Sequence, residues 1–292
     1  MKFRVRHSTR YQYSMAVSDG QSSTVLLPRT TPWQRVERAD LLISPEPRWQ
    51  REYQDWFGNR RCDFAVESIH DFLQVVADSR VEVIPPLLPE PASTPAWESA
   101  LQDEPLLMPY RLPSGLVPGV SDGMRDYALQ SFTPQRPLMQ AALELTQRIY
   151  ADFAYVQGVT EISTPVAQVF ESRAGVCQDF AHLQLALLRS LGLACRYVSG
   201  YIETRPAEGQ AGLVGADASH AWISLHVPGT GWIDFDPTNN QIPSDRHVVV
   251  AWGRDYSDVV PVKGYTSGGG AQTLQVAVEV SADQDGPEQR WL

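Results

Sequence analysis

The sequence predicts an α+β fold, in which an all-β N-terminal module precedes a core made of a buried helix packed on an antiparallel β-sheet. Three patterns carry this prediction. Apolar and polar residues alternate through the first 84 residues, an apolar stripe at helical spacing follows position 177, and two alternating runs separated by a short turn follow position 219. The length of 292 residues leaves room for both parts.

The β module is predicted over residues 1–84. Its apolar runs, such as Phe64-Ala65-Val66, are typical of strands, and turn formers such as Phe57-Gly58-Asn59 separate them. Nothing in this segment indicates chemistry. His7 and His70 are therefore expected at the surface or at a strand edge.

A proline-rich stretch is predicted to link the module to the core. Nine prolines lie between residues 85 and 118, and each removes a backbone donor that a long helix or a central strand needs. The linker is expected over residues 85–123 and the core over residues 124–265. A C-terminal strand and a polar tail are expected over residues 266–292.

The central element of the core is a helix that begins at Cys177. Gly175 precedes the cysteine by two residues, and Gly192 is a typical left-handed stop. A cysteine in the first turn of a helix lies at the positive end of the dipole, which favours the thiolate. The alternative is a small core cysteine, since free cysteine is among the most buried residue types. The apolar face of this helix comprises Phe180, Leu183, Leu187, Leu188 and Leu191.

A base for this thiol, and an acceptor for the base, lie on two later strands. After a polar loop over residues 204–218, His220 opens one strand, and Asp234 and Asp236 lie on the next. A thiolate nucleophile needs a base, and that base needs an acceptor that fixes its tautomer. A helix packed on this hairpin would bring Cys177, His220 and one of the two aspartates together.

The strand register decides whether the aspartate can reach the histidine. If Val227 pairs with Trp232 across a four-residue turn, Asp236 points away from the face that carries His220, because side chains alternate along a strand. A contact between His220 and Asp236 therefore requires a connection of odd effective length or a β-bulge. We predict such an irregularity, together with a hydrogen bond of about 2.6–3.2 Å between the two side chains.

The composition argues against several classes of function. The chain carries 24 basic and 34 acidic residues, a net charge of −10, which disfavours a nucleic-acid partner or an anionic membrane surface. No apolar run approaches the ~20 residues of a membrane span, and the charged N-terminus lacks the apolar core of a signal peptide. Three cysteines, Cys62, Cys177 and Cys195, form no disulfide framework. A cytoplasmic location is expected, and the oligomeric state stays open.

Three segments of the core resemble the signature blocks of the transglutaminase-like superfamily. They are residues 175–182 (Gly-Val-Cys-Gln-Asp-Phe-Ala-His), 218–222 (Ala-Ser-His-Ala-Trp) and 231–238 (Gly-Trp-Ile-Asp-Phe-Asp-Pro-Thr). The first part of the chain is similar to the β-rich N-terminal region of the bacterial members, through residues 11–14 and 55–59. The resemblance implies a papain-like, transglutaminase-like fold for the core.

The resemblance also implies roles for individual residues. It makes Cys177 the nucleophile, His220 the general base and acid, and Asp236, which precedes the Pro-Thr pair, the orienting carboxylate. The backbone N–H of Cys177 is the first candidate oxyanion donor. No metal and no cofactor is expected. Further candidate contacts to the oxyanion or the substrate are Tyr155, Gln178 and Trp222.

The implied reaction is acyl transfer at an amide bond of a peptide or protein substrate, through a thioester. With water as the acceptor the protein is a cysteine peptidase or amidase, a hydrolase, which we favour because water needs no second binding site. With an amine as the acceptor it is a transglutaminase. A third alternative is a non-catalytic protein-binding scaffold with a vestigial site.

A metal site is the remaining alternative, since thiolate and imidazole are good zinc ligands. The chain lacks a close pair of cysteines, which makes this the weaker hypothesis. His182 lies about 140° around the helix from Cys177, so a structural hydrogen bond is expected for it rather than a role as base. The candidate ligands are Cys177, His182, Cys195, His220 and Asp236.

Overall fold

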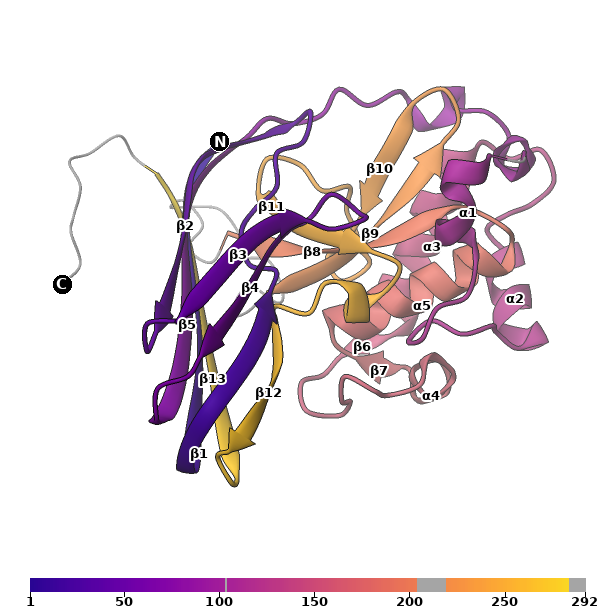
Figure 1. Cartoon of the computed structure of the whole chain (residues 1–292). Helices are drawn as coiled ribbons and strands as arrows, with labels where there is room; N and C mark the ends of the chain where they lie inside the picture. The colour runs from indigo at the N-terminus through magenta and orange to yellow at the C-terminus, as the bar shows by residue number, and fades with distance from the viewer. Residues whose placement is uncertain (103, 204–218, 284–292) are drawn as a thin grey trace.

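The structure is a computed structural model and describes residues 1–102, 104–203 and 219–283. A large antiparallel sheet, a four-stranded sheet and a group of helices follow one another across the molecule (Figure 1). This is the predicted α+β arrangement, with an all-β module beside a core in which a helix packs on an antiparallel sheet. The predicted polar loop over residues 204–218 and the polar tail beyond residue 283 lie outside the described residues.

The β module is a seven-stranded sheet built around its first strand, β1 (Lys2–Thr24). One half of β1 pairs with β5 and β13, and the other half pairs with β4 and β12. The main order along the sheet is β2-β5-β1-β4-β3. The remaining strands are β2 (Gln34–Ser44), β3 (Trp49–Gln54), β4 (Arg60–Val66), β5 (His70–Val83), β12 (Val262–Gly268) and β13 (Gln272–Ala282).

The last two strands differ from the predicted organisation. Both β12 and β13 pair with β1, so residues 262–282 belong to the sheet of the β module rather than to the core or to a separate C-terminal strand. The chain leaves the module after β5, forms the core and returns. Periodicity marks a strand but not its partner, and here Phe3 pairs with Ala282 from the far end of the chain.

The proline-rich stretch over residues 85–123 is folded onto the core. It contains α1 (Met108–Arg111), the start of α2 (Asp122–Leu129) and three short 3₁₀ helices. Two of these, η1 (Pro91–Ser93) and η3 (Pro105–Leu107), begin with proline, where a helix needs no backbone donor. The stretch therefore covers hydrophobic surface as well as connecting two parts. Its buried apolar residues are Ala100, Leu107, Tyr110 and Val117.

The central helix of the core is α5 (Cys177–Ser190), which packs on β8 and β9. Every side chain from Asp179 to Arg189 is buried. The helix ends before Gly192, whose φ of +82° is the left-handed conformation predicted for the stop. The four-stranded sheet has the order β10-β9-β8-β11. Its strands are β8 (Cys195–Ile202), β9 (His220–Val227), β10 (Gly231–Phe235) and β11 (His247–Gly253).

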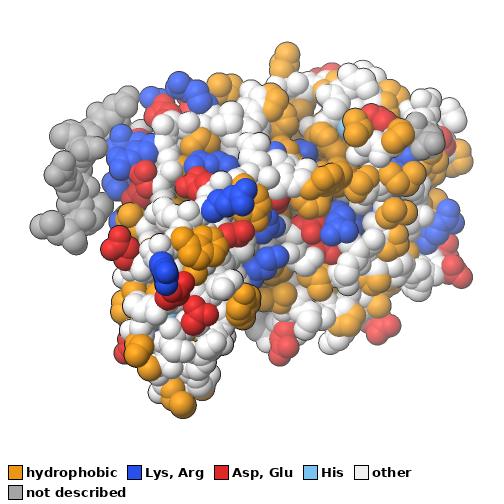
Figure 2. All heavy atoms as spheres, viewed as in Figure 1, with side chains coloured by type: hydrophobic (Ala, Val, Ile, Leu, Met, Phe, Trp, Pro, Cys, Tyr) orange, Lys and Arg blue, Asp and Glu red, His pale blue; other side chains and the backbone are white. Residues whose placement is uncertain are grey.

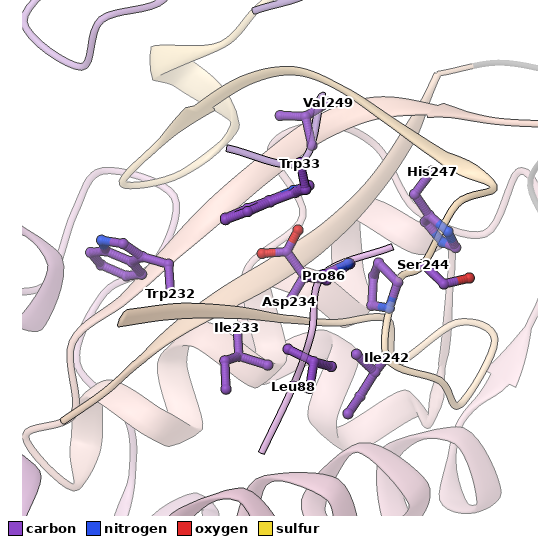
Figure 3. A pocket seen from close by; sticks show the side chains of 11 residues that line it. Trp33, Pro86, Leu88, Trp232, Ile233, Asp234, Ile242, Ser244, His247 and Val249 are labelled. Atoms are coloured by element: carbon purple, nitrogen blue, oxygen red, sulfur yellow. The ribbon is translucent and has the colours of Figure 1, made fainter. Parts of the chain in front are cut away.

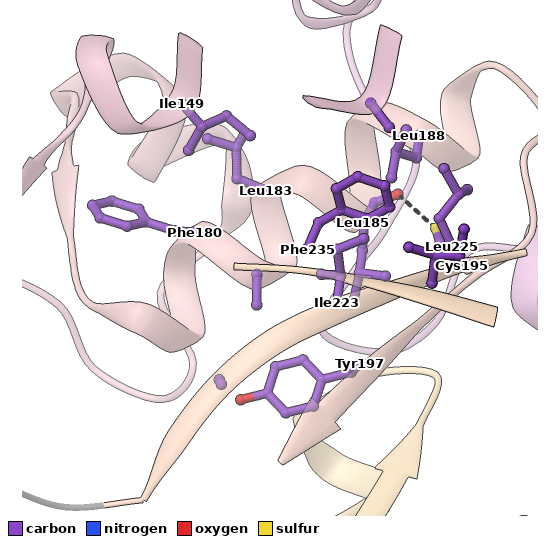
Figure 4. Packing of buried hydrophobic residues seen from close by; sticks show 14 of the residues in the cluster. Ile149, Phe180, Leu183, Leu185, Leu188, Cys195, Tyr197, Ile223, Leu225 and Phe235 are labelled. Atoms are coloured by element: carbon purple, nitrogen blue, oxygen red, sulfur yellow. Dashed lines mark hydrogen bonds between the residues drawn. The ribbon is translucent and has the colours of Figure 1, made fainter. Parts of the chain in front are cut away.

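Apolar side chains fill the space between α5 and the sheet, as Figure 4 shows. Leu183 and Leu185 of the helix belong to the same cluster as Ile223 and Phe235 of the strands. The sulfhydryl of Cys195 donates to the carbonyl of Leu185 at 3.7 Å within this cluster. Around this centre lie α3 (Leu138–Asp152), α4 (Val166–Ser172) and the two-residue strands β6 (Ala154–Tyr155) and β7 (Ala174–Gly175).

The hairpin of β9 and β10 has the odd connection that the sequence required. Val227 pairs with Gly231, so three residues join the strands instead of four. Asp234 pairs with Ser224, which places Asp234 and Asp236 on the face of the sheet that carries His220. The predicted irregularity is confirmed, and it lies in the turn.

A polar seam joins the β module to the core. Asn59 is fully buried, and its side chain accepts from the backbone N–H of Trp252 at 3.0 Å and donates to the carbonyl of the same residue at 2.8 Å. The guanidinium groups of Arg29 and Arg196 lie 3.1 and 3.5 Å from the ring centroid of Trp252. Both groups are close enough for cation–π attraction. Arg196 belongs to β8 of the core, so the contact of Arg29 is the one that ties β11 to the module.

His7 lies in this seam and not at the surface, where the sequence analysis expected it. Its side chain is buried, with Nδ1 2.9 Å from the hydroxyl of Tyr201 and Nε2 2.9 Å from the hydroxyl of Thr9. Burial lowers the pKa of His7 to about 4. Tyr201 belongs to β8, so the expectation failed because it took the module as a free sheet with nothing packed on it.

Charged side chains of both signs are interspersed over the exposed face of the module in Figure 2. That face therefore carries no large field of one sign, despite the net charge of −10. Among the residues that the structure describes, no helix combines the length and apolar character needed to cross a membrane.

Candidate active site

Cys177 is the first residue of α5, and the local sequence builds this helix start. The carboxylate of Asp179 accepts from the backbone N–H of Val176 at 2.8 Å and from the hydroxyl of Thr160 at 2.6 Å. A Cβ at Gly175 would lie 2.7 Å from the same carboxylate, so only glycine fits there. The Gly-Val-Cys-Gln-Asp motif is therefore the signature of a helix start that presents Cys177 in its first turn.

Cys177 and His220 line one cleft of about 250 Å³. Cys177 is partly exposed, whereas Cys62 and Cys195 are buried. The described residues that line the cleft include no Asp, Glu, Lys or Arg, so its walls are aromatic, hydroxyl and amide groups. The other lining residues are Tyr155, Gln157, Val176, Gln178, Tyr197, Ser199, Ser219, Ala221 and Tyr256.

His220 is held by Asp236 through one ring nitrogen. Nε2 donates to Oδ2 of Asp236 at 2.9 Å, as predicted, and both side chains are fully buried. Nδ1 is buried and has no hydrogen-bond partner among the described residues, so it is the nitrogen left for the thiol. Burial lowers the pKa of His220, but the charge and hydrogen bond of Asp236 and the interaction with Cys177 outweigh it and raise the pKa to about 10. An imidazolium is thus favoured beside the sulfur.

Within the described part of the chain, the carboxylate of Asp236 receives five hydrogen bonds. Oδ1 accepts from the backbone N–H groups of Thr238 at 2.9 Å and Asn239 at 3.2 Å. Besides the His220 bond, Oδ2 accepts from the Asn239 amide at 2.8 Å and from Nε2 of His247 at 3.2 Å. Burial raises the pKa of Asp236, but the charge and hydrogen bond of His220 and the hydrogen bond of His247 outweigh burial and hold it well below its usual range.

Both halves of the chain match known families. Residues 3–82 match the bacterial transglutaminase-like N-terminal region, and residues 125–237 match the transglutaminase-like superfamily. An uncharacterized protein of Mycobacterium tuberculosis is 40% identical over 297 residues, which cover 96% of this chain and 92% of that protein. The chain belongs to the transglutaminase-like superfamily. An uncharacterized protein of Mycobacterium leprae is 31% identical over 284 residues, covering 96% of this chain and 98% of that protein.

A solved structure shares the fold of this transglutaminase-like protein. It is the “Putative Cysteine Protease” of Cytophaga hutchinsonii, which aligns with a TM-score of 0.74 at 23% identity and covers 100% of this chain and 94% of that chain. A likeness at this identity shows the fold alone. A shorter match, 36% identical over 77 residues, links 26% of this chain to 11% of the protein-glutamine gamma-glutamyltransferase of Pseudomonas aeruginosa.

Two of the three further contacts predicted for this transglutaminase-like site lie in the cleft. Tyr155 and Gln178 line it, and the Gln178 amide donates to the carbonyl of Ile162 at 3.1 Å. Trp222 does not reach the cleft: it is fully buried, and its indole N–H donates to Asp234 at 2.9 Å. The prediction that Trp222 contacts the oxyanion or the substrate is therefore wrong.

Trp222 instead supports the imidazole from behind. Its ring stacks on that of His220 with the centroids 5.9 Å apart. A Cβ at Gly200 would lie 2.5 Å from the indole, so glycine at this position of β8 makes room for it. Alternation along β9 puts Trp222 on the same face of the sheet as His220. The sequence pattern did not show that the cleft reaches His220 but not Trp222.

Of the metal ligands considered from the sequence, His220 and Asp236 lie together, whereas His182 and Cys195 lie in other surroundings. His182 accepts from the backbone N–H of Tyr256 at 3.2 Å, and burial lowers its pKa to about 4, which fits the structural role expected for it. Within the described ranges, the group of three side chains that could hold a metal is His220, Asp236 and His247, with no cysteine. Since both histidines donate to the carboxylate, we interpret this group as a hydrogen-bonded cluster.

Sequence reasoning missed Asn239 and His247. A signal for Asn239 was present, because an Asp followed by Pro-Thr-Asn is typical of a turn in which the carboxylate accepts nearby backbone donors. No local signal marks His247. It opens β11, which pairs with β8, and only the order of the sheet brings it to Asp236.

Proposed function

We propose that this transglutaminase-like protein catalyses thiol-dependent acyl transfer at an amide bond and that it is a hydrolase, a cysteine peptidase or amidase. One observation carries the proposal. The partly exposed Cys177 begins a helix in the same cleft as His220, whose other ring nitrogen is held by Asp236 at 2.9 Å. These are the three roles of a nucleophile, a base and an orienting carboxylate.

The chemistry follows from these positions. The thiolate of Cys177 attacks the amide carbonyl, and the backbone N–H of Cys177 at the helix start stabilises the oxyanion, with Tyr155 as the proposed second donor. The tetrahedral intermediate collapses with cleavage of the C–N bond, and His220 gives its proton to the leaving amine. A water molecule then attacks the thioester as His220 accepts a proton from it, and the C–S bond breaks, which releases the carboxylic acid product and restores the thiolate of Cys177 beside the imidazolium of His220.

The lack of Asp, Glu, Lys and Arg among the described residues of the cleft supports an uncharged acyl segment as substrate. Apart from the reacting pair of Cys177 and His220, its walls carry hydroxyl, amide and aromatic groups, which would not compensate a buried charge on the ligand. We favour water as the acceptor because hydrolysis needs no second site for an amine.

Transglutamination is the second candidate. The observation in its favour is the 77-residue match to the protein-glutamine gamma-glutamyltransferase of Pseudomonas aeruginosa. The two reactions share every step up to the thioester, so the acceptor alone distinguishes them.

A peptide-library screen with and without added amine tests both candidates. We expect cleavage without amine, and loss of activity by roughly 10⁴-fold or more in Cys177→Ala. The matched control is Cys62→Ala, a buried cysteine far from the cleft, which should keep its activity. Products formed only with amine would support transglutamination, and absence of any product would favour the vestigial scaffold.

Alkylation tests the thiol without a substrate. Burial raises the pKa of Cys62 and of Cys195 to about 11, so neither should react near pH 6. We expect iodoacetamide to modify Cys177 selectively at that pH, as located by mass spectrometry. Equal modification of the three cysteines would contradict an activated nucleophile.

A further inference from the structure

His247 is a second imidazole on the carboxylate that holds His220. Its side chain is 3% exposed, and Nε2 lies 3.2 Å from Oδ2 of Asp236, the same oxygen that accepts from His220. The ring centroids of the two histidines are 6.2 Å apart. Asp236 follows β10 and His247 opens β11, and these strands are the two edges of the four-stranded sheet. One carboxylate therefore joins both edges.

The surroundings fix which nitrogen of His247 makes this bond. Its ring packs edge-on against Trp222 at 5.2 Å, and Nδ1 is buried with no hydrogen-bond partner among the described residues. His247 and Asp234 lie around a small cavity of about 20 Å³ behind the sheet (Figure 3). Nε2 of His247 is therefore the nitrogen that donates to Asp236. This requires the Nε2–H tautomer, because an ionised carboxylate only accepts hydrogen bonds.

Few charged groups of the described residues lie near His247. Asp236 and His220 face it from the hairpin, and Asp234 lies nearby on β10. Its chain neighbour Arg246 pairs with Glu203 at 3.1 Å, at the end of β8. Burial lowers the pKa of His247, and the hydrogen bond and charge of Asp236 only partly oppose this, so the ring is neutral at pH 7. A neutral N–H donor stabilises the carboxylate without placing a second positive charge beside His220.

We propose that His247 is a positioning residue, whose Nε2–H fixes Oδ2 of Asp236 and thereby holds the ring of His220 toward Cys177. The proposal rests on the proposed function of this site. His247 is not among the residues that line the cleft, and its hydrogen bond to Asp236 is the polar contact through which it reaches His220. Without it, Asp236 would take up a proton more readily and would hold His220 less firmly.

Two amide substitutions make a matched pair. In His247→Gln the side-chain nitrogen can occupy the place of Nε2, whereas in His247→Asn it ends near the place of Nδ1 and cannot reach Asp236. Both replacements are neutral, polar amides, so the two variants differ mainly in how far the side-chain nitrogen reaches toward Asp236. The readout is the rate at which iodoacetamide modifies Cys177 from pH 4 to 9, located by mass spectrometry, with thermal unfolding as the test of the fold.

We expect the Gln variant to follow the wild-type profile. The Asn variant should react roughly tenfold more slowly near pH 6, as is common when a partner behind the reacting residues is lost. The acid side of its alkylation profile should also move to higher pH, because Asp236 loses a donor that favours the ionised carboxylate. A wild-type profile in a folded Asn variant would overturn the proposal, as would equal losses in both variants at unchanged thermal stability.

A measurement on the wild type covers the case in which neither variant folds. Nitrogen NMR of ¹⁵N-histidine-labelled protein at pH 7 should show His247 as the Nε2–H tautomer. The Nδ1–H tautomer would overturn the proposal.

Alkylation also separates this proposal from the proposed function. If the protein cleaves no amide but the two variants show the expected profiles, the proposed function is wrong and the positioning role of His247 stands. If the protein cleaves amides but the wild type and both variants show the same alkylation profile, the proposed function stands and the positioning role is wrong.

Discussion

The core and the β module bury their residues in opposite ways. In the core, α5 is buried on all sides from Asp179 to Arg189, and the side chains of His220 and Asp236 are fully excluded from water. In the module, all six residues of β3 are exposed, and Val280 is the one fully buried residue of β13. The core surrounds the carboxylate of Asp236 with donors, whereas the module leaves the whole of β3 open to water.

This difference has an energetic meaning. A buried carboxylate is tolerated only when donors replace its water, and Asp236 has five of them. A change in the core therefore removes a partner that nothing replaces. A change on an open strand is compensated by water, so its cost should be small.

The largest effect is expected from a matched pair of aspartates in the core. Asp236→Asn should lower kcat/KM for an amide substrate by roughly 10³-fold, because an amide no longer fixes the tautomer of His220. Asp234→Asn, on the same face of the hairpin, keeps an oxygen that can accept from the indole N–H of Trp222, and the variant should stay within about tenfold. Equal losses in the two variants would show that the face as a whole matters and not the one carboxylate.

The outcome for these aspartates shows what a sequence can predict. Alternation along β9 and β10 was enough to see that His220 and Asp236 conflict with a four-residue turn, and the three-residue turn resolves the conflict. The helix start at Cys177 could also be predicted, because Gly175 and Asp179 shape it from within a few residues. Short-range geometry of this kind is encoded in the local sequence.

What the sequence did not show depends on contacts between distant elements. His247 joins the site only because β11 lies beside β8, and β12 and β13 join the module only because β1 accepts them. His7 is buried for the same reason, by a core strand packed against the module. Periodicity reports that a face is apolar, but not which element covers it.

The second effect concerns the seam between the regions. Asn59→Ala should lower the free energy of unfolding by about 2–3 kcal/mol, because it leaves both backbone groups of Trp252 without their buried partner. Gln50→Ala on the exposed β3 is the control and should change it by less than about 0.5 kcal/mol. Urea unfolding measures both. Two separate transitions, with only the first moved by Asn59→Ala, would show that the module and the core unfold independently.

The third effect is on the pH dependence of stability. Burial lowers the pKa of His7 from 6.5 to about 4, so the unfolded chain binds a proton more readily than the folded one. The contribution is therefore present above pH 6.5 and is lost as the pH falls toward 4, by about 2 kcal/mol at pH 5. His7→Leu should reduce the difference in unfolding free energy between pH 7 and pH 5 by that amount. An unchanged difference would mean that His7 gains its proton without leaving the seam.

The smallest effect is expected at the open end of β13, where the comparison can be made within one strand. Val276, Val278 and Val280 lie on one face because side chains alternate. Val276 is 46% exposed, Val278 packs on the edge of the core cluster and Val280 is fully buried. The same face therefore passes from exposed to buried over the five residues from Val276 to Val280.

Valine to threonine keeps the shape and adds a hydroxyl, so burial alone should decide its cost at the two ends of that face. Val276→Thr should change the free energy of unfolding by less than about 0.5 kcal/mol. Val280→Thr should cost about 1–3 kcal/mol, because its hydroxyl is taken out of water. Urea unfolding of the two variants measures the difference. Equal costs would mean that β13 is stabilised by its pairing with β1 throughout, and that the core does not cover its far end.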